Sequence, residues 1–264
     1  MTNPSQFTQG RQVSSPAAAD MLTTAITAHG GAERWQQVAV IEAALSSYGL
    51  AFSMKQQGSA LKNLRISVYP HQQRVTLGGF AKPEWCGIWT PQQVLLQDGD
   101  GKLVAQRDNP YAAFFTLKKR LAWDKLDILY FAGKALWNYL CFPFYLANEG
   151  VTLTGIDAGG ESGSRMLRAE FKPAVPSHSV LETFHIDDAG LLLRHDYTAT
   201  VIGSWATAAN RCLNWERVDG LRFYTRRRVT PRFGDQLVLP APMLVWIELT
   251  DIRVINKPEE HAAR

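Results

Sequence analysis

The sequence is poor in the residues that build covalent or metal-bound scaffolds. Only three of its 264 residues are cysteine, and Cys86, Cys141 and Cys212 stand far apart with no C-x-x-C spacing. An odd and dispersed set excludes a disulfide framework and a cysteine-based zinc site. We therefore expect three reduced, mostly buried thiols, and we expect neither a metal nor a cofactor.

The motifs of several large enzyme classes are also missing. The sequence has no H-x-x-x-H pair for a metal and no G-x-S-x-G nucleophile elbow, of which Gly203-Ser204 is only a fragment. Gly78-Gly79 and Gly159-Gly160 are isolated pairs, typical of turns rather than of a phosphate-binding loop. The sequence alone therefore identifies no reaction.

Charge gives little sign of a nucleic-acid partner, and we expect none. The net charge is +4, and the one dense basic cluster, Arg226 to Arg228, alternates between the two faces of an expected strand. The first twenty residues contain no apolar segment, so we expect no secretory signal and a cytoplasmic location. We also expect no membrane span.

Most of the chain has the two-residue period of antiparallel strands. Asp98 to Gly101, Asp187 to Gly190 and Asp219-Gly220 are turn signals between such segments. Alternation of strands with crossover helices is absent, which argues against a nucleotide-binding doubly wound fold. We expect strands at 38–48, 50–57, 62–70, 73–80, 85–90, 92–98, 102–107, from 151 onward, 180–186, 191–197, 206–218, 221–231 and 244–255.

Helices are expected at two places. Ser15 and Pro16 begin the first, which ends at the glycines after His29. The second region is a helical insertion near residues 110–147. We expect a disordered tail over 1–14, one domain over 15–255 and a flexible tail over 256–264.

The segment from Trp123 to Ala147 is the most unusual part of the sequence. From Asp127 onward it holds seven aromatic residues in twenty-one positions and only two charges. Asp124 is placed to cap a helix with Asp127 as its capping-box partner, and Pro143 is expected to end that helix. The uninterrupted stretch spans roughly 22 Å, too short for a membrane crossing.

Something must cover a helix this apolar. It can plug the open side of a curved sheet, form a wall or lid of an apolar ligand cavity, or lie on a membrane surface. For the cavity alternative, aromatic and aliphatic side chains of the helix and of a later hairpin are the candidate ligand contacts. These candidates are Phe131, Trp137, Tyr139, Phe184 and Leu193.

The hairpin from Val180 to Tyr197 offers the only acid–base candidates. With a loop at 187–190, Ile186 pairs with Leu191, and Glu182 then pairs with His195 on the mostly apolar, inward face. A carboxylate beside a histidine suits a general base. The candidate catalytic residues are Glu182, His195, Asp196 and Tyr197. A one-residue slip would send Glu182 and His195 outward and Asp196 inward.

Three segments together resemble the LolA-like superfamily of lipoprotein-carrier domains. They are AHGGAERWQQVAVIEAALS at the end of the first helix, FHIDDAGLLLRHDYTA in the hairpin, and VDGLRFYTRRRVTPR followed by LVWIELTDIRVI. The resemblance covers residues 20–255 in pattern and turn placement, and contains no catalytic motif. The sequence is most similar to the cytoplasmic, uncharacterised branch of that superfamily.

The resemblance implies a mainly β (α+β) fold. It consists of a single antiparallel, strongly curved and unclosed β-barrel of about eleven strands, with helices packed in its concave side. The carriers hold lipid acyl chains there, and one similar fold performs cofactor-free chemistry on an aromatic intermediate.

Three functions follow as hypotheses. The first is a binding protein for an apolar or amphipathic small molecule, lipid-like or aromatic. The second is a cofactor-free enzyme acting on such a molecule. The third is a structural domain that docks a protein partner, of unknown identity, through the aromatic helix.

Overall fold

The computed structural model describes residues 15–156, 163–234 and 237–258, and almost all of its strands belong to one antiparallel sheet. The sheet has fourteen strands and does not close on itself, so the expected unclosed half-barrel is confirmed with more strands than the eleven expected. The strands are β1 Val38–Tyr48, β2 Leu61–Tyr69, β3 Arg74–Gly78, β4 Cys86–Trp89, β5 Gln93–Gln97, β6 Leu103–Asp108, β7 Val151–Ile156, β8 Ser164–Phe171, β9 Leu181–Asp187, β10 Leu192–Thr198, β11 Thr207–Val218, β12 Leu221–Phe233, β13 Leu237–Val238 and β14 Val245–Asn256.

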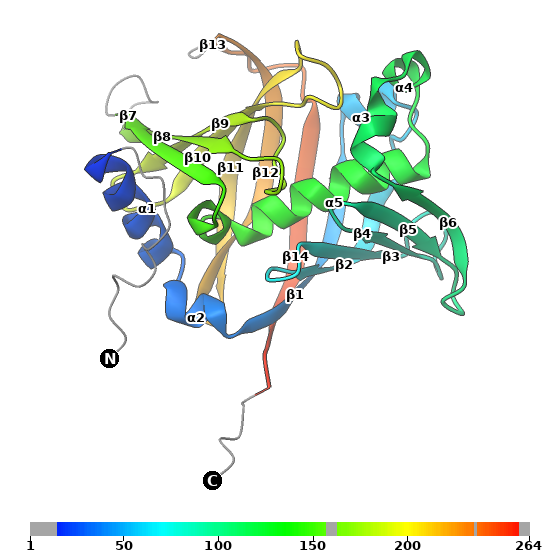
Figure 1. The fold of residues 1–264 in the computed structure, drawn as a ribbon, viewed down its shortest axis with the longest axis horizontal. Coiled ribbons are helices and arrows are strands. Elements are labelled where there is room, and N and C mark those ends of the chain that lie inside the picture. The colour runs from blue at the N-terminus through cyan, green and yellow to red at the C-terminus, as the bar shows by residue number, and fades with distance from the viewer. Residues whose placement is uncertain (1–14, 157–162, 235–236, 259–264) are drawn as a thin grey trace.

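The last long strand lies in the middle of the sheet. The order is β6-β5-β4-β3-β2-β1-β14-β12-β11-β10-β9-β8-β7, with β13 paired to β12 outside this path. Strand β14 therefore joins two meanders, one built before the aromatic segment and one built after it (Figure 1). The aromatic segment connects the two far edges, β6 and β7, and so must cross the concave side.

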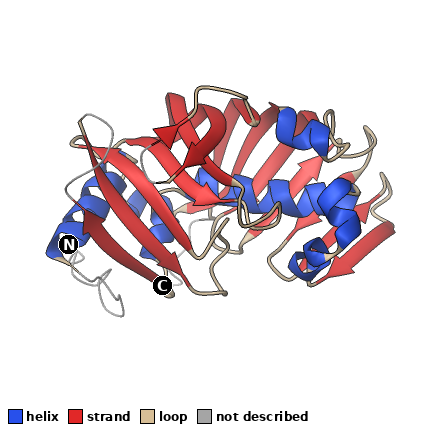
Figure 2. Cartoon of the chain, turned by 90° about the horizontal axis from the view of Figure 1, so that it is seen from above, coloured by secondary structure: helices blue, strands red, loops and turns tan. Residues whose placement is uncertain are grey.

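The helices are short except for two. They are α1 Pro16–Ala28, α2 Ala32–Gln36, α3 Leu50–Met54, η2 Pro110–Phe115, α4 Leu117–Leu121, α5 Lys125–Cys141 and η3 Phe144–Ala147. The long aromatic helix α5 lies inside the curve of the sheet, where it packs on β2 to β5 and on β12 (Figure 2). Within the described residues, no helix combines the length and apolarity that a membrane crossing needs.

The expected helix boundaries are largely confirmed. The Ser15 hydroxyl accepts a hydrogen bond from the amide of Ala18, and Pro16 follows in the first turn. The helix ends at Ala28, and the amides of Gly30 and Gly31 beyond it donate to carbonyls of its last turn. Helix α5 ends two residues before Pro143, as its position predicts.

The capping box at the start of α5 is confirmed and carries more charge than expected. The side chains of Asp124 and Asp127 each accept the other residue's amide, and both also contact Arg107 and Lys119. Burial raises the pKa of Asp124, but hydrogen bonds from Arg107 and Lys119 outweigh it and hold that pKa below its ordinary value. Both carboxylates therefore cap the N-terminus of α5.

One strand prediction is wrong. Residues 50–57, expected as a strand after Gly49, instead begin with helix α3. A Cβ on Gly49 would lie 2.3 Å from the carbonyl oxygen of Leu244, so the two backbones pass each other closely just before β14 begins. The amides of Leu50 and Ala51 donate to the carbonyls of Met243 and Leu244, which turns the chain out of the sheet.

His29, at the end of α1, is a fully buried neutral histidine. Its Nδ1–H donates to the carbonyl of Ala25 at 2.7 Å, and the hydroxyl of Tyr224 donates to its Nε2 at 3.2 Å. Burial, followed by the charges of Arg222 and Arg227, lowers its pKa from 6.5 to about 4. Folding therefore requires the uncharged ring.

This burial predicts acid sensitivity. Below pH 6.5 the unfolded chain binds a proton at His29 that the folded chain rejects until about pH 4, so stability is lost as the pH falls through that window. We expect His29 to account for a loss of about 2 kcal/mol between pH 7.5 and pH 5. Urea unfolding at both values measures it, and in His29→Gln that loss should shrink by about this amount. An unchanged pH dependence in the variant would refute the assignment.

Candidate functional site

Glu182 and His195 form a buried pair on the concave side of the sheet. The Nε2–H of His195 donates to Oε2 of Glu182 at 2.6 Å, and the two residues are 2% and 1% exposed, respectively. Oε1 of Glu182 accepts the amides of His178 and Ser179 at 2.5 and 2.9 Å. The carboxylate thus fixes the chain between β8 and β9 as well as the His195 ring.

The expected strand register of this hairpin is wrong, although the two residues do meet. Ile186 pairs with Leu192 rather than Leu191, so the register is already shifted by one residue at the turn, and a bulge at Leu193 shifts it by one more. His195 therefore lies opposite Phe184, on which it stacks at 4.3 Å, and reaches Glu182 diagonally. Val180, just before β9, is exposed.

Asp196 does not join this group. It lies on the other face of β10, where Arg194 donates to both of its oxygens and His185 contacts it at 3.0 Å. Burial raises the pKa of Asp196, but the hydrogen bonds from His185 and Arg194 outweigh it and leave the pKa lowered. Arg194, His185 and Asp196 are all buried, and they contact one another on this face of the sheet.

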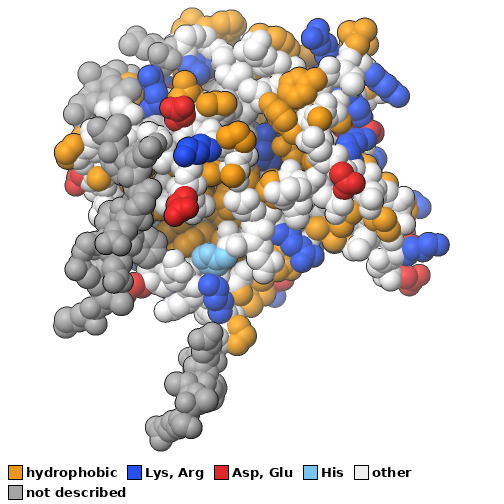
Figure 3. Space-filling view, viewed as in Figure 1, with side chains coloured by type: hydrophobic (Ala, Val, Ile, Leu, Met, Phe, Trp, Pro, Cys, Tyr) orange, Lys and Arg blue, Asp and Glu red, His pale blue; other side chains and the backbone are white. Residues whose placement is uncertain are grey.

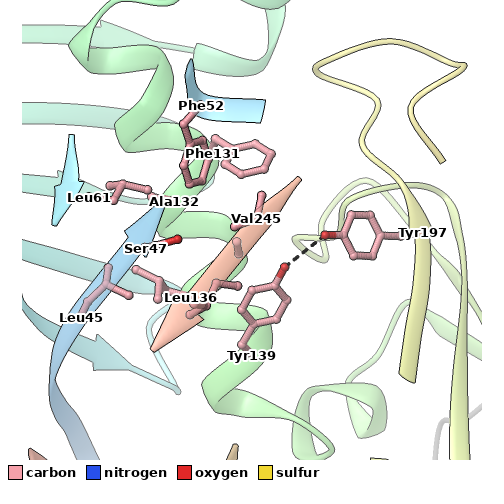
Figure 4. Close-up of a pocket in the computed structure, with 12 residues that line it drawn as sticks. Leu45, Ser47, Phe52, Leu61, Phe131, Ala132, Leu136, Tyr139, Tyr197 and Val245 are labelled. Carbon is pink, nitrogen blue, oxygen red and sulfur yellow. Dashed lines mark hydrogen bonds between the residues drawn. The ribbon is translucent and has the colours of Figure 1, made fainter. Parts of the chain in front are cut away.

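Tyr197 contacts His178 and His195 on one side and helix α5 on the other. The rings of His178 and Tyr197 stack with centroids 4.1 Å apart, and the Tyr197 hydroxyl lies 3.3 Å from that of Tyr139 (Figure 4). Burial raises the pKa of both tyrosines, that of Tyr139 to about 12, and lowers the pKa of His178 well below 6.5. All three side chains are therefore neutral at pH 7.

Beside these hydroxyls lies a small apolar cavity of about 30 Å³. Its walls come from α5, from α3 and from the strands β1, β2, β10 and β14 (Figure 4). The lining residues are Leu45, Ser47, Phe52, Leu61, Phe131, Ala132, Ala135, Leu136, Tyr139, Tyr197, Val245 and Ile247. The cavity is small beside typical ligand sites of about 300 Å³ or more, so the helix nearly fills the barrel.

The five residues expected to contact a ligand therefore lie in different parts of the structure. Phe131 and Tyr139 line this cavity, whereas Phe184 is core, packed between His195 and Phe142. Trp137 borders a different hollow, near Trp35 and His71. Leu193, the bulged residue, is half-buried and lies in the wall of neither of these two spaces.

A larger cleft of about 410 Å³ opens on the other side of His178. Its walls are helix α5, the end of β4, and the segments 109–111 and 171–180. The lining residues are Trp89, Pro91, Asn109, Tyr111, Tyr130, Lys134, Phe171, Lys172, Pro173, Val175, Pro176, Ser177, His178, Ser179, Val180 and Thr200. Its volume lies in the range of small-molecule sites.

Two buried cations near these sites were missed at the sequence level. Lys134 lines the cleft, and Arg227 lies over the rings of Tyr139 and Tyr224 and donates to the carbonyl of Tyr139. A lysine inside an otherwise apolar helix was a usable signal for the first. Arg227 is one of three consecutive arginines, and only the pairing of β12 shows that it is the buried one.

The molecular surface carries both positive and negative side chains. On the face shown in Figure 3, basic and acidic side chains are interspersed, and hydrophobic side chains stand between them. Among residues 15–156, 163–234 and 237–258, no group of three or more His, Cys, Asp or Glu is placed to hold a metal ion.

The fold matches known structures although the sequence does not. A LolA superfamily protein from Nitrosomonas europaea superimposes with a TM-score of 0.52 at 9% identity, covering 92% of this chain and 96% of that one. A DUF1329 family protein from Desulfovibrio piger superimposes with a TM-score of 0.51 at 9% identity, covering 91% and 94%. No protein-family model and no curated protein matches the sequence. The chain therefore has a LolA-like fold.

Proposed function

We propose that this protein binds an apolar or amphipathic small molecule on the concave side of its sheet. The observation that carries the proposal is the 410 Å³ cleft, whose inner wall is helix α5. Aromatic rings of Tyr111 and Tyr130 supply apolar contact area, as in small-molecule sites generally. The LolA-like fold supports the same location, since the carriers that the sequence resembles hold acyl chains on this side.

The cleft and the small inner cavity flank one group of rings. His178 lines the cleft, Tyr139 and Tyr197 line the cavity, and the three rings contact one another. Rotation of His178 or Tyr197 would join the two spaces. A ligand longer than the cleft would then extend its apolar end along α5.

A cytoplasmic location is part of this proposal. The three cysteines are all free, and Cys141 is buried against no other thiol. Free thiols suit a reducing compartment. Cell fractionation of the natural host tests the location directly.

The binding proposal predicts that blocking the cleft removes the ligand. Ser177 lines the cleft and is half-buried, so Ser177→Trp should place an indole in it; Ala174, on the same loop, is exposed and does not line it. We expect a bound small molecule in native mass spectra of gently purified wild type and Ala174→Trp. In Ser177→Trp we expect the fraction of protein that carries the small molecule to fall below about a tenth of the wild-type fraction.

Fluorescence titration with N-phenyl-1-naphthylamine, a neutral apolar dye, provides the measurement independent of purification. Binding to wild type and to Ala174→Trp, with loss in Ser177→Trp, supports the proposal. Absence of both a co-purified molecule and dye binding in the wild type would refute it, as would equal binding by the two variants.

A cofactor-free enzyme is the second candidate, favoured by one observation. The Nε2 of His178 is buried without a hydrogen-bond partner, on a neutral ring at the wall of the cleft. A neutral imidazole in this position can accept a proton from a bound molecule. Mass spectrometry of the ligand recovered from wild type and from His178→Gln separates the candidates, because only an enzyme would leave a chemically different molecule in the two proteins.

The third hypothesis, docking of a partner through the aromatic helix, requires an exposed face on that helix. Every residue of α5 from Leu126 to Cys141 is buried within the chain itself. A partner could reach these side chains only if the helix left the sheet.

A further inference from the structure

Lys134 is a buried amine with no anion beside it. It lies in the middle of α5, is 3% exposed, and its Nζ stands 5.4 Å from the ring centroid of Tyr130. Within the described parts of the chain, no hydrogen bond or ion pair reaches the amine. Burial lowers its pKa to about 8, so most of the amine still carries a charge at pH 7.

Glu182, the acid whose charge acts on Lys134, forms no ion pair with it within the described chain. Glu182 acts on Lys134 only through its field, and that field raises the lysine pKa. Both of its oxygens are already used, by His195 on one side and by the amides of His178 and Ser179 on the other. A buried ammonium without a contacting anion is costly, and such groups in proteins are normally paired.

The cleft in front of Lys134 has the charge of an anion site. Its lining contains no Asp or Glu, and a second cation, Lys172, stands exposed among the lining residues. His178, whose buried Nε2 has no hydrogen-bond partner, belongs to the same lining. In the tautomer with the proton on Nε2, this ring offers one hydrogen bond.

We infer that the cleft recognises the carboxylate of an acid with an apolar or aromatic body. Lys134 would be the counter-ion, and the Nε2–H of His178 would donate to the second carboxylate oxygen. The body of the acid would lie against Tyr130 and Tyr111. One buried ammonium matches the single charge of a carboxylate better than the double charge of a phosphate monoester. This inference rests on the proposed binding function and adds the chemical class of the ligand.

The test compares acids with neutral molecules of the same shape. Isothermal titration calorimetry of the wild type at pH 7 and about 0.15 M salt would use naphthalene-2-carboxylate against 2-naphthamide. A second comparison, of decanoate with 1-decanol, shows whether the cleft binds aromatic or lipid-like acids. We expect at least one acid to bind about tenfold more tightly than its neutral counterpart.

The matched variants are Lys134→Met and Lys102→Met. Lys134→Met should reduce the affinity for the acid by about tenfold and leave that for the neutral molecule unchanged. Lys102→Met, at an exposed position outside the cleft, should change the affinity for the acid less than about threefold. Melting curves and far-UV circular dichroism confirm that both variants fold.

The failures are distinguishable. If acids and neutral molecules bind the wild type equally, the carboxylate inference is wrong and the binding function survives; this comparison needs no variant. Undiminished acid binding by Lys134→Met also overturns the inference. If none of the four probes and no neutral dye binds, the binding function itself fails.

Discussion

Glu182→Ala is expected to lower the free energy of unfolding by about 3–5 kcal/mol, since three buried N–H donors lose their acceptor at about 1–3 kcal/mol each. The substitution leaves the Nε2–H of His195 and the amides of His178 and Ser179 without their acceptor, in a site that water does not reach. Those amides belong to the loop that lines the cleft. Ligand binding should therefore fall together with stability.

Urea unfolding at pH 7 measures this effect. Glu170→Ala on the neighbouring strand β8 is the control, because Glu170 is exposed, and its loss should stay within about 0.5 kcal/mol. Glu182→Gln keeps one carbonyl oxygen for the two amides and should cost less than Glu182→Ala. Equal losses for Glu182→Ala and Glu170→Ala would show that the buried pair contributes nothing.

Gly133→Ala should destabilise the protein by about 3 kcal/mol, although alanine is the better helix former by about 1 kcal/mol. Gly133 is in the middle of α5, and a Cβ there would lie 2.3 Å from both Cβ and Cγ of Trp89 on β4. Trp89 is fully buried, and these two atoms are next to the backbone, so neither can move aside. The helix would have to leave the sheet.

Thermal and urea unfolding of Gly133→Ala test this expectation against Gly78→Ala. A Cβ on Gly78 would meet its neighbours at ordinary distances of 3.6 Å and more, so little change is expected there. In a double-mutant cycle, Trp89→Leu should cost less in the Gly133→Ala background than in the wild type. Stabilisation of the protein by Gly133→Ala would contradict the close approach of α5 and β4.

Local signals that depend on a few neighbouring residues were readable without the structure. The caps at Ser15 and Asp124, the end of α5 before Pro143, and the turns at Asp187–Gly190 and Asp219–Gly220 each follow from backbone chemistry within four residues. The two-residue period gave most strands. Residues 50–57 were missed because a contact with Met243 and Leu244, far along the chain, turns them into α3.

The site could be predicted only in part, for the same reason. Alternation placed Glu182, His195 and Tyr197 on one face, but the bulge at Leu193 is invisible to a count of residues. Asp196 was grouped with them by nearness in sequence, whereas neighbours on a strand face opposite ways.

The sequence by itself determined that an apolar helix interrupts a long antiparallel sheet and that this helix is too short to cross a membrane. Only the tertiary structure decided what covers it. Because β14 inserts between β1 and β12, the two meanders curve around α5 and bury it on all sides. The same closure brings Lys134 to the wall of a cleft formed by segments distant in sequence, where its charge has no partner within the described chain. Burial of a charge depends on everything packed around it, and no local pattern encodes that.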